Sequence, residues 1–135
     1  MNFNVLVLFC SRKGNFGRNK ARLVQQARKA MFYALRKARK LSLPIDILLQ
    51  VFDAMVAPIL LYSAEVWGYE KNDIAETLHL EFCKYINMKV KKCTPNYIVY
   101  SELGRVPMSV HINARMIGFW ARIVIGKKEK ISKTL

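Results

Sequence analysis

Acidic residues are scarce in this chain of 135 residues. Nine Asp and Glu stand against 23 Lys and Arg, which gives a formal net charge of +14. A domain this basic usually has a polyanionic partner, either nucleic acid or an anionic membrane. The alternative is a basic surface that serves solubility alone, because net charge indicates association and not a specific site.

Cysteine is also rare, and the spacing of Cys10, Cys83 and Cys93 matches no zinc or redox template. We therefore expect reduced, mostly buried thiols in an intracellular protein. The apolar segment 3–10 has no basic stretch before it and no small-residue cleavage site after it, so we expect no signal peptide. The longest apolar run, near 55–62, is far shorter than the ~20 residues that span a bilayer. We therefore expect no transmembrane segment.

Signatures of catalysis are missing as well. The two histidines, His79 and His111, have no cysteine or serine in a recognised catalytic arrangement, and no phosphate-binding glycine loop is present. Glu76 and His79 form an E-x-x-H motif, but a di-iron bundle needs two such motifs and two further glutamates. A capping glutamate and a surface histidine are the simpler interpretation. We predict no catalytic residue, no metal and no cofactor.

Hydrophobic periodicity predicts one mostly α domain over residues 1–135, with about six helices and one short N-terminal β-strand. The expected parts, in chain order, are a strand remnant at 1–11, a basic amphipathic helix at 18–41, a helical core at 44–125 and a frayed, Lys-rich tail at 126–135. The apolar positions that we expect to face the core include Leu23, Ala27, Met31, Leu41, Ile74, Phe82, Tyr85, Ile112, Trp120 and Ile123.

The most apolar stretch predicts a central helix at 58–68, around which the other helices pack. It contains Glu65, and a buried carboxylate is costly unless it is paired. We expect Arg105 or Arg115 to pair with Glu65. A catalytic acid with a perturbed pKa is the alternative.

The clearest functional signal is the basic helix. Eleven basic residues and no acidic one lie between Arg12 and Lys40. Like charges at helical spacing repel one another, so we infer an anion that relieves the repulsion. Lys and Arg at this spacing neutralise phosphates without reading bases. The predicted nucleic-acid-binding residues are Arg18, Arg22, Arg28, Lys29, Arg36 and Lys40.

Two further features of this helix bear on its partner. Phe32 lies within the basic face, where it suits either stacking on a base or packing under a neighbouring loop. Binding to a membrane needs bulky apolar residues that insert, but the core needs the apolar side of this helix. We therefore rank nucleic acid above a membrane.

Several segments carry a resemblance to a known family. They are A-P-I-L-L-Y-S-A-E-V-W-G-Y-E at 57–70, L-E-F-C-K-Y at 80–85, T-P-N at 94–96, V-Y-S-E-L-G-R at 99–105 and F-W-A-R at 119–122. In order and spacing they resemble the region downstream of the polymerase core in non-LTR retrotransposon reverse transcriptases, the jockey-like and LINE-like elements. The resemblance covers nearly the whole chain. Residues 5–13 resemble the segment after the family's tyrosine-leucine-glycine motif, which is not intact here.

The resemblance implies a thumb-like, C-terminal part of an RNA-directed DNA polymerase that holds the template–primer duplex by its backbone. The family's catalytic aspartates lie upstream of the matching region, and the chain has no Asp-Asp pair. Two-metal phosphoryl transfer needs such carboxylates. The expected protein is a truncated copy that is not an enzyme, and its partners are an RNA–DNA hybrid or duplex and the rest of a reverse transcriptase. A structural or decaying remnant with no ligand of its own is the alternative.

Overall fold

The computed structural model describes residues 17–69, 73–87 and 91–134, and the strand predicted at 1–11 lies outside them. The described part is mostly α, as predicted. Its elements are α1 (Gly17–Lys40), α2 (Ile45–Val51), the π-helical turn η1 (Phe52–Val56), α3 (Ala57–Leu60), α4 (Ala64–Trp67), α5 (Asp73–Ile86), α6 (Asn96–Leu103) and α7 (Met108–Thr134).

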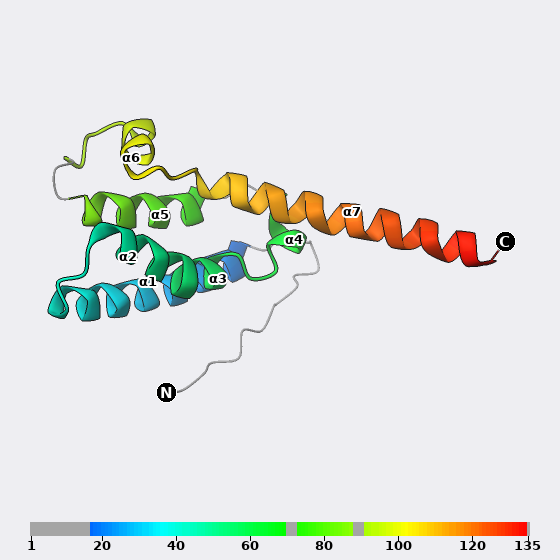
Figure 1. The fold of residues 1–135 in the computed structure, drawn as a ribbon, viewed down its shortest axis with the longest axis horizontal. Coiled ribbons are helices and arrows are strands. Elements are labelled where there is room, and N and C mark those ends of the chain that lie inside the picture. Colours follow the sequence, from blue (N-terminus) through cyan, green and yellow to red (C-terminus); the bar gives the residue numbers. More distant parts are fainter. Residues whose placement is uncertain (1–16, 70–72, 88–90, 135) are drawn as a thin grey trace.

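The helices form a packed body from which one long helix projects (Figure 1). α1 packs against α2, η1 and α3 on one side and against α5 on another, and α6 packs on α5. α7 contacts α4 and α5 near its start and then extends away from the body. The largest fully buried side chains of this core include Met31, Phe52, Leu60, Trp67, Leu78, Met108 and Ile112.

The apolar stripe of α1 is buried as its periodicity predicts. Leu23, Ala27 and Met31 are all less than a tenth exposed, since residues three and four apart share one face of a helix. Leu41 was expected on this stripe but is 69% exposed, because α1 ends at Lys40 and the chain turns away. On α5, Ile74 and Tyr85 are exposed against expectation, while Phe82 is buried.

Pro58 distorts the helix that follows α2. Its ring lacks an N–H and collides with the carbonyl four residues earlier, which an α-helix cannot accommodate. The preceding turn, Phe52–Val56, is π-helical, and the N–H of Ala57 bonds to the carbonyl of Phe52 five residues back. The wider turn still buries Phe52 and Val56 completely and leaves Asp53 on the outer side.

The predicted central helix at 58–68 is broken into α3 and α4, which corrects the expectation of one continuous element. Ser63 adopts the left-handed conformation, with φ 53° and ψ 28°, so the helical path stops there. Side chains bond to two backbone carbonyls at the break; the carbonyl of Leu61 also accepts from the N–H of Ala64 at 3.1 Å. The indole N–H of Trp67 donates to the carbonyl of Tyr62 at 2.7 Å, and Arg115 donates to the carbonyl of Leu61 at 3.2 Å.

Gly68 allows α4 and α7 to approach each other closely. A Cβ on this residue would lie 2.7 Å from Ile112 Cγ2, 2.7 Å from Met116 Sδ and 2.5 Å from the carbonyl oxygen of Ala64. No carbon atom tolerates such distances without displacing its neighbours. The glycine is therefore required by packing, since its own backbone conformation (φ −66°, ψ −15°) is open to any residue.

α7 continues to Thr134, so the tail predicted to be frayed from residue 126 is helical. Gly126 does not end the helix, and helix-forming lysines follow it. Only the first turns of α7 are buried, at Met108 and Ile112, whereas Trp120 and Ile123 are exposed although we expected them in the core. None of the helices in the described ranges is long and apolar enough to span a bilayer.

We expect Gly68→Ala to destabilise the protein by about 1–3 kcal/mol, because the added methyl group overpacks the α4–α7 contact. Gly118→Ala is the matched control, since a Cβ at Gly118 meets no atom within 4 Å. It should leave stability unchanged or raise it slightly, because alanine favours a helix. Urea denaturation of both variants measures the difference; equal stability of the two would contradict the close approach.

Candidate nucleic-acid interface

Five of the six predicted nucleic-acid-binding residues lie in one row along α1. Arg18, Arg22, Lys29, Arg36 and Lys40 are all exposed, and at 3.6 residues per turn they fall within a sector of about 40°. At a rise of roughly 1.5 Å per residue the row is about 33 Å long. We call these five residues the basic row. The buried stripe lies on the opposite side of the helix, so packing of the core directs the basic row to solvent.

Arg28, the sixth predicted residue, is exposed but lies on the flank of α1. Its guanidinium forms an ion pair with Glu81 of α5 at 3.2 Å. An exposed pair of this kind contributes little to stability. The pair partly neutralises Arg28, so this residue is a weaker candidate for a phosphate contact than the basic row.

Phe32 is 43% exposed on the same side of the helix. Tyr33, one position further, is 49% exposed and has the Lys37 ammonium 5.7 Å from its ring centroid. The basic side of α1 therefore presents two aromatic rings to solvent. Stacking of Phe32 on a base stays a prediction.

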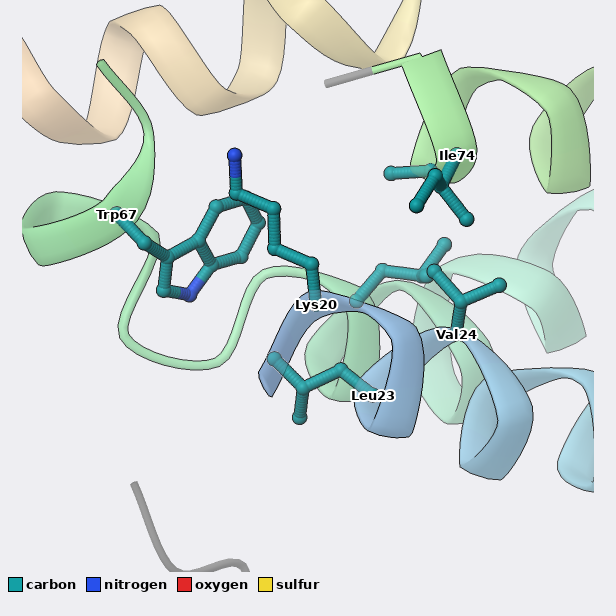
Figure 2. A pocket seen from close by; sticks show the side chains of 7 residues that line it. Lys20, Leu23, Val24, Trp67 and Ile74 are labelled. Atoms are coloured by element: carbon teal, nitrogen blue, oxygen red, sulfur yellow. The ribbon is translucent and has the colours of Figure 1, made fainter. Parts of the chain in front are cut away.

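Lys20 differs from the other cations of α1 because it is only 7% exposed. Figure 2 shows its side chain beside the ring of Trp67, and the ammonium lies 5.5 Å from the ring centroid. Both side chains line a cavity of only about 10 Å³, together with Leu23, Val24, Leu60, Ile74 and Ala75. Such a space holds about one water molecule. Lys20 therefore contributes to packing of the core and not to a ligand site.

The helical pattern of the sequence contains a signal for the burial of Lys20. On a helical wheel Lys20 falls between Ala27 and Met31, in the centre of the buried stripe. A lysine there extends its methylene chain along apolar side chains. Its position on the wheel therefore separates it from the cations of the basic row.

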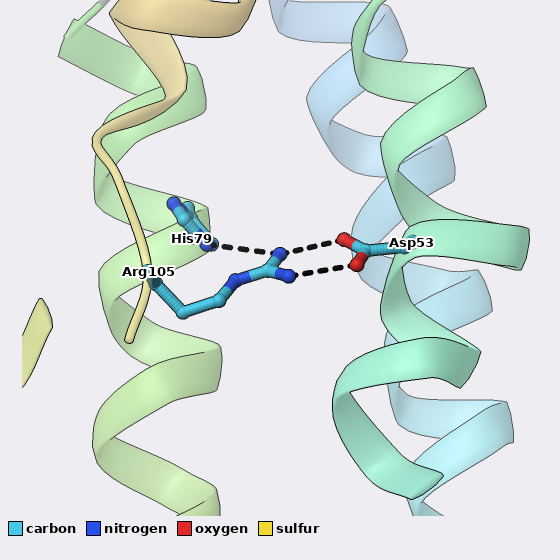
Figure 3. A network of polar contacts seen from close by, with 3 residues as sticks. All are labelled: Asp53, His79 and Arg105. Atoms are coloured by element: carbon cyan, nitrogen blue, oxygen red, sulfur yellow. Dashed lines mark hydrogen bonds and ion pairs between the residues drawn. The ribbon is translucent and has the colours of Figure 1, made fainter. Parts of the chain in front are cut away.

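A polar network joins three parts of the chain that are far apart in sequence (Figure 3). Arg105, in the connection between α6 and α7, donates to both carboxylate oxygens of Asp53 in η1, at 2.7 and 2.6 Å. The same guanidinium lies 3.5 Å from Nε2 of His79 on α5. A two-pronged contact of this kind is among the strongest charge-assisted hydrogen bonds. It keeps the pKa of the Asp53 carboxyl below its usual range.

His79 is completely buried, which corrects the expectation of a surface histidine. Its ring stacks on Phe52 with centroids 5.3 Å apart. Burial and the nearby Arg105 lower its pKa to about 4, so the imidazole is neutral near pH 7. Because arginine can only donate, Nε2 is the acceptor and the proton sits on Nδ1. Within the described residues Nδ1 has no hydrogen-bond partner.

Glu76, expected to cap α5, bridges this helix to other elements. One carboxylate oxygen accepts a hydrogen bond from the hydroxyl of Tyr100 on α6, and the other accepts from the backbone N–H of Ser109 at 3.2 Å. Burial and this bond raise the pKa of Tyr100. Glu76 and His79 thus hold α5, α6 and α7 together. No group of three or more potential metal-binding side chains occurs in the part of the chain that is described.

Glu65 is half-buried, and the two arginines expected to pair with it have other partners. Arg105 binds Asp53, and Arg115 donates to the carbonyl of Leu61. The expected ion pair is therefore wrong, and Asp53, which was not among the expected partners, takes the place of Glu65. The sequence offers little signal for this exchange, because it depends on the π-helical turn that positions Asp53.

The cysteines match the expectation in part. Cys83 is buried, and burial raises the pKa of its thiol to about 11, which makes it a poor nucleophile at neutral pH. Cys93 is exposed, and Cys10 lies outside the described residues.

Comparison of the chain with protein-family models, with curated proteins and with solved structures gives no significant match. The resemblance to reverse transcriptases therefore rests on the residues quoted above, and any function must be argued from the site itself.

We expect the free energy of unfolding to fall by about 2 kcal/mol between pH 7 and pH 5 because of His79. In the unfolded chain this histidine binds a proton below its ordinary pKa of 6.5, whereas in the folded protein it does so only below about 4. The contribution of His79 to stability is therefore fully present above about pH 6.5 and decreases as the pH falls from 6.5 towards 4. Asp53 stays ionised there, since its pKa is lowered.

Urea denaturation at several pH values tests this expectation on wild type and on His79→Phe, which keeps an aromatic ring. In this variant the free energy of unfolding should no longer change between pH 5 and pH 6.5. His111→Gln, at the exposed histidine, is the control and should keep the dependence on pH. A His79→Phe variant with the slope of the wild type would contradict the buried neutral imidazole.

Proposed function

We propose that this protein is a non-catalytic module that binds the sugar-phosphate backbone of an RNA–DNA hybrid or duplex without reading its sequence. The observation that carries the proposal is the basic row: Arg18, Arg22, Lys29, Arg36 and Lys40 lie in one exposed line on a helix fixed by its buried side. A duplex carries one negative charge per about 1.7 Å of its axis, so a straight row of cations meets many phosphates.

The arrangement of charge favours an extended anion over a small one. The row is about 33 Å long, far more than a single phosphate or metabolite can span. The first turn of α1 contains no acidic residue, and its last turn contains Lys37, Arg39 and Lys40. The cations along this side of α1 repel one another, and the helix contains no acidic side chain that would offset the repulsion. A polyanion lying along the helix would relieve it, with release of the counterions bound to the nucleic acid.

The proposal agrees with the resemblance to the thumb-like region of non-LTR retrotransposon reverse transcriptases, whose other parts are then further candidate partners. Beyond its buried first turns, α7 exposes Ile117, Trp120, Val124 and Ile131. Large exposed apolar side chains of this kind are typical of a surface that another protein part covers. This feature supports a module that works within a larger polymerase.

Binding of the protein to a labelled RNA–DNA duplex over a series of salt concentrations tests the proposal. Five phosphate contacts predict a slope of log affinity against log salt of about −4.5. The triple variant Arg22→Glu, Lys29→Glu and Arg36→Glu should weaken binding and reduce the magnitude of the slope by about 3, since each lost phosphate contact removes about 1.

A second triple variant controls for net charge. Lys127→Glu, Lys128→Glu and Lys130→Glu on the projecting part of α7 change the charge by the same amount at a different place. This control should bind nearly as the wild type does. An equal loss of affinity in both triple variants would show that binding depends on net charge and not on the basic row. Absence of salt-dependent binding by the wild type would leave a structural remnant with no ligand.

A further inference from the structure

A pocket of about 270 Å³ opens where the end of α1, the start of α2 and the end of α5 meet. Its walls are apolar and include Leu35, Leu43, Leu48 and Ile86. The described residues that line it include no carboxylate. Small-molecule pockets usually measure about 300–1,000 Å³, so this one has room for a single flat ring system.

Two side chains with flat π surfaces line the pocket beside these walls. Tyr85 is 42% exposed, and the guanidinium of Arg39 lies 5.5 Å from its ring centroid. Both a tyrosine ring and an arginine plane stack on nucleobases, and such stacking tolerates every base because each has a π face. The pair thus offers a stacking surface at the side of an apolar pocket.

The pocket adjoins the basic row. Leu35 and Ala38 line it from the buried side of α1. Arg39 lines it as well and lies three residues after Arg36, so these two arginines are neighbours on the surface of the helix. A strand whose phosphate contacts Arg36 therefore passes next to Arg39, at the side of the pocket.

We propose that this pocket receives one unpaired nucleobase of the bound nucleic acid, an inference that rests on the proposed function. A paired base is held inside the stack of a duplex and does not reach a pocket of this kind. The ligand is therefore a base from a bulge, a gap or a single-stranded end. Arg36 holds a flanking phosphate, and Arg39 and Tyr85 stack on the base. The protein thus prefers a duplex with an unpaired base to a fully paired one.

The test compares two RNA–DNA duplexes of equal length, one fully paired and one with a single bulged 2-aminopurine. We expect about tenfold tighter binding of the bulged duplex, since stacking of one base on an aromatic side chain typically contributes on that order. The fluorescence of the 2-aminopurine should also change on binding, because the base leaves water for the pocket.

Two matched variants test whether the preference for the bulged duplex arises at the pocket. Tyr85→Leu removes the ring but keeps an apolar side chain at a partly exposed position. It should bind the paired duplex like the wild type and lose the preference for the bulge. Tyr33→Leu removes another exposed tyrosine with a cation above its ring, and Tyr33 does not line the pocket. It should keep the preference.

The outcomes separate this inference from the proposed function. Equal affinity of the wild type for the two duplexes, with a normal salt slope, overturns the base pocket and leaves backbone binding in place. A preference that survives in Tyr85→Leu also overturns the base pocket. Salt-independent or absent binding of both duplexes overturns the proposed function and the base pocket together.

Discussion

Burial of the apolar stripe of α1 is the constraint on which the rest of the structure depends. Ala27 and Met31 are almost completely inaccessible to solvent and pack in the same core as Phe52 and Leu60. Once this side is fixed, the rotation of the helix is fixed, and every cation on the opposite side faces solvent. The basic row is therefore a consequence of core packing and needs no loop or ligand to order it.

The network around Arg105 performs a different task from the basic row. It places a guanidinium between η1 and α5, two elements that also contact α1, and so ties the connection before α7 to the body. His79 is neutral at this position and therefore adds no second positive charge beside the guanidinium. We interpret the network as structural, because its carboxylate and guanidinium satisfy each other. The polyanion binding that we propose relies on the exposed cations of α1 instead.

The sequence predicted well those features that depend on local pattern. The 3.6-residue period of α1 predicted which side of this helix is buried and which side presents its cations to solvent. Other features depend on distant contacts. The break at Ser63 depends on the partners that Trp67 and Arg115 find, and no local residue indicates it. Trp120 is exposed because α7 extends beyond the other helices at this point, and the local pattern of α7 does not indicate where those helices end.

The position of nucleic acid along the basic row is tested most directly by mapping the contact. An RNA–DNA duplex with 4-thiouridine in the RNA strand can be cross-linked to the protein by light, and the cross-linked peptides identified by mass spectrometry. We expect cross-links within residues 18–40, with few on the equally lysine-rich outer part of α7. Cross-links spread over both helices, or concentrated on α7, would contradict binding along the basic row.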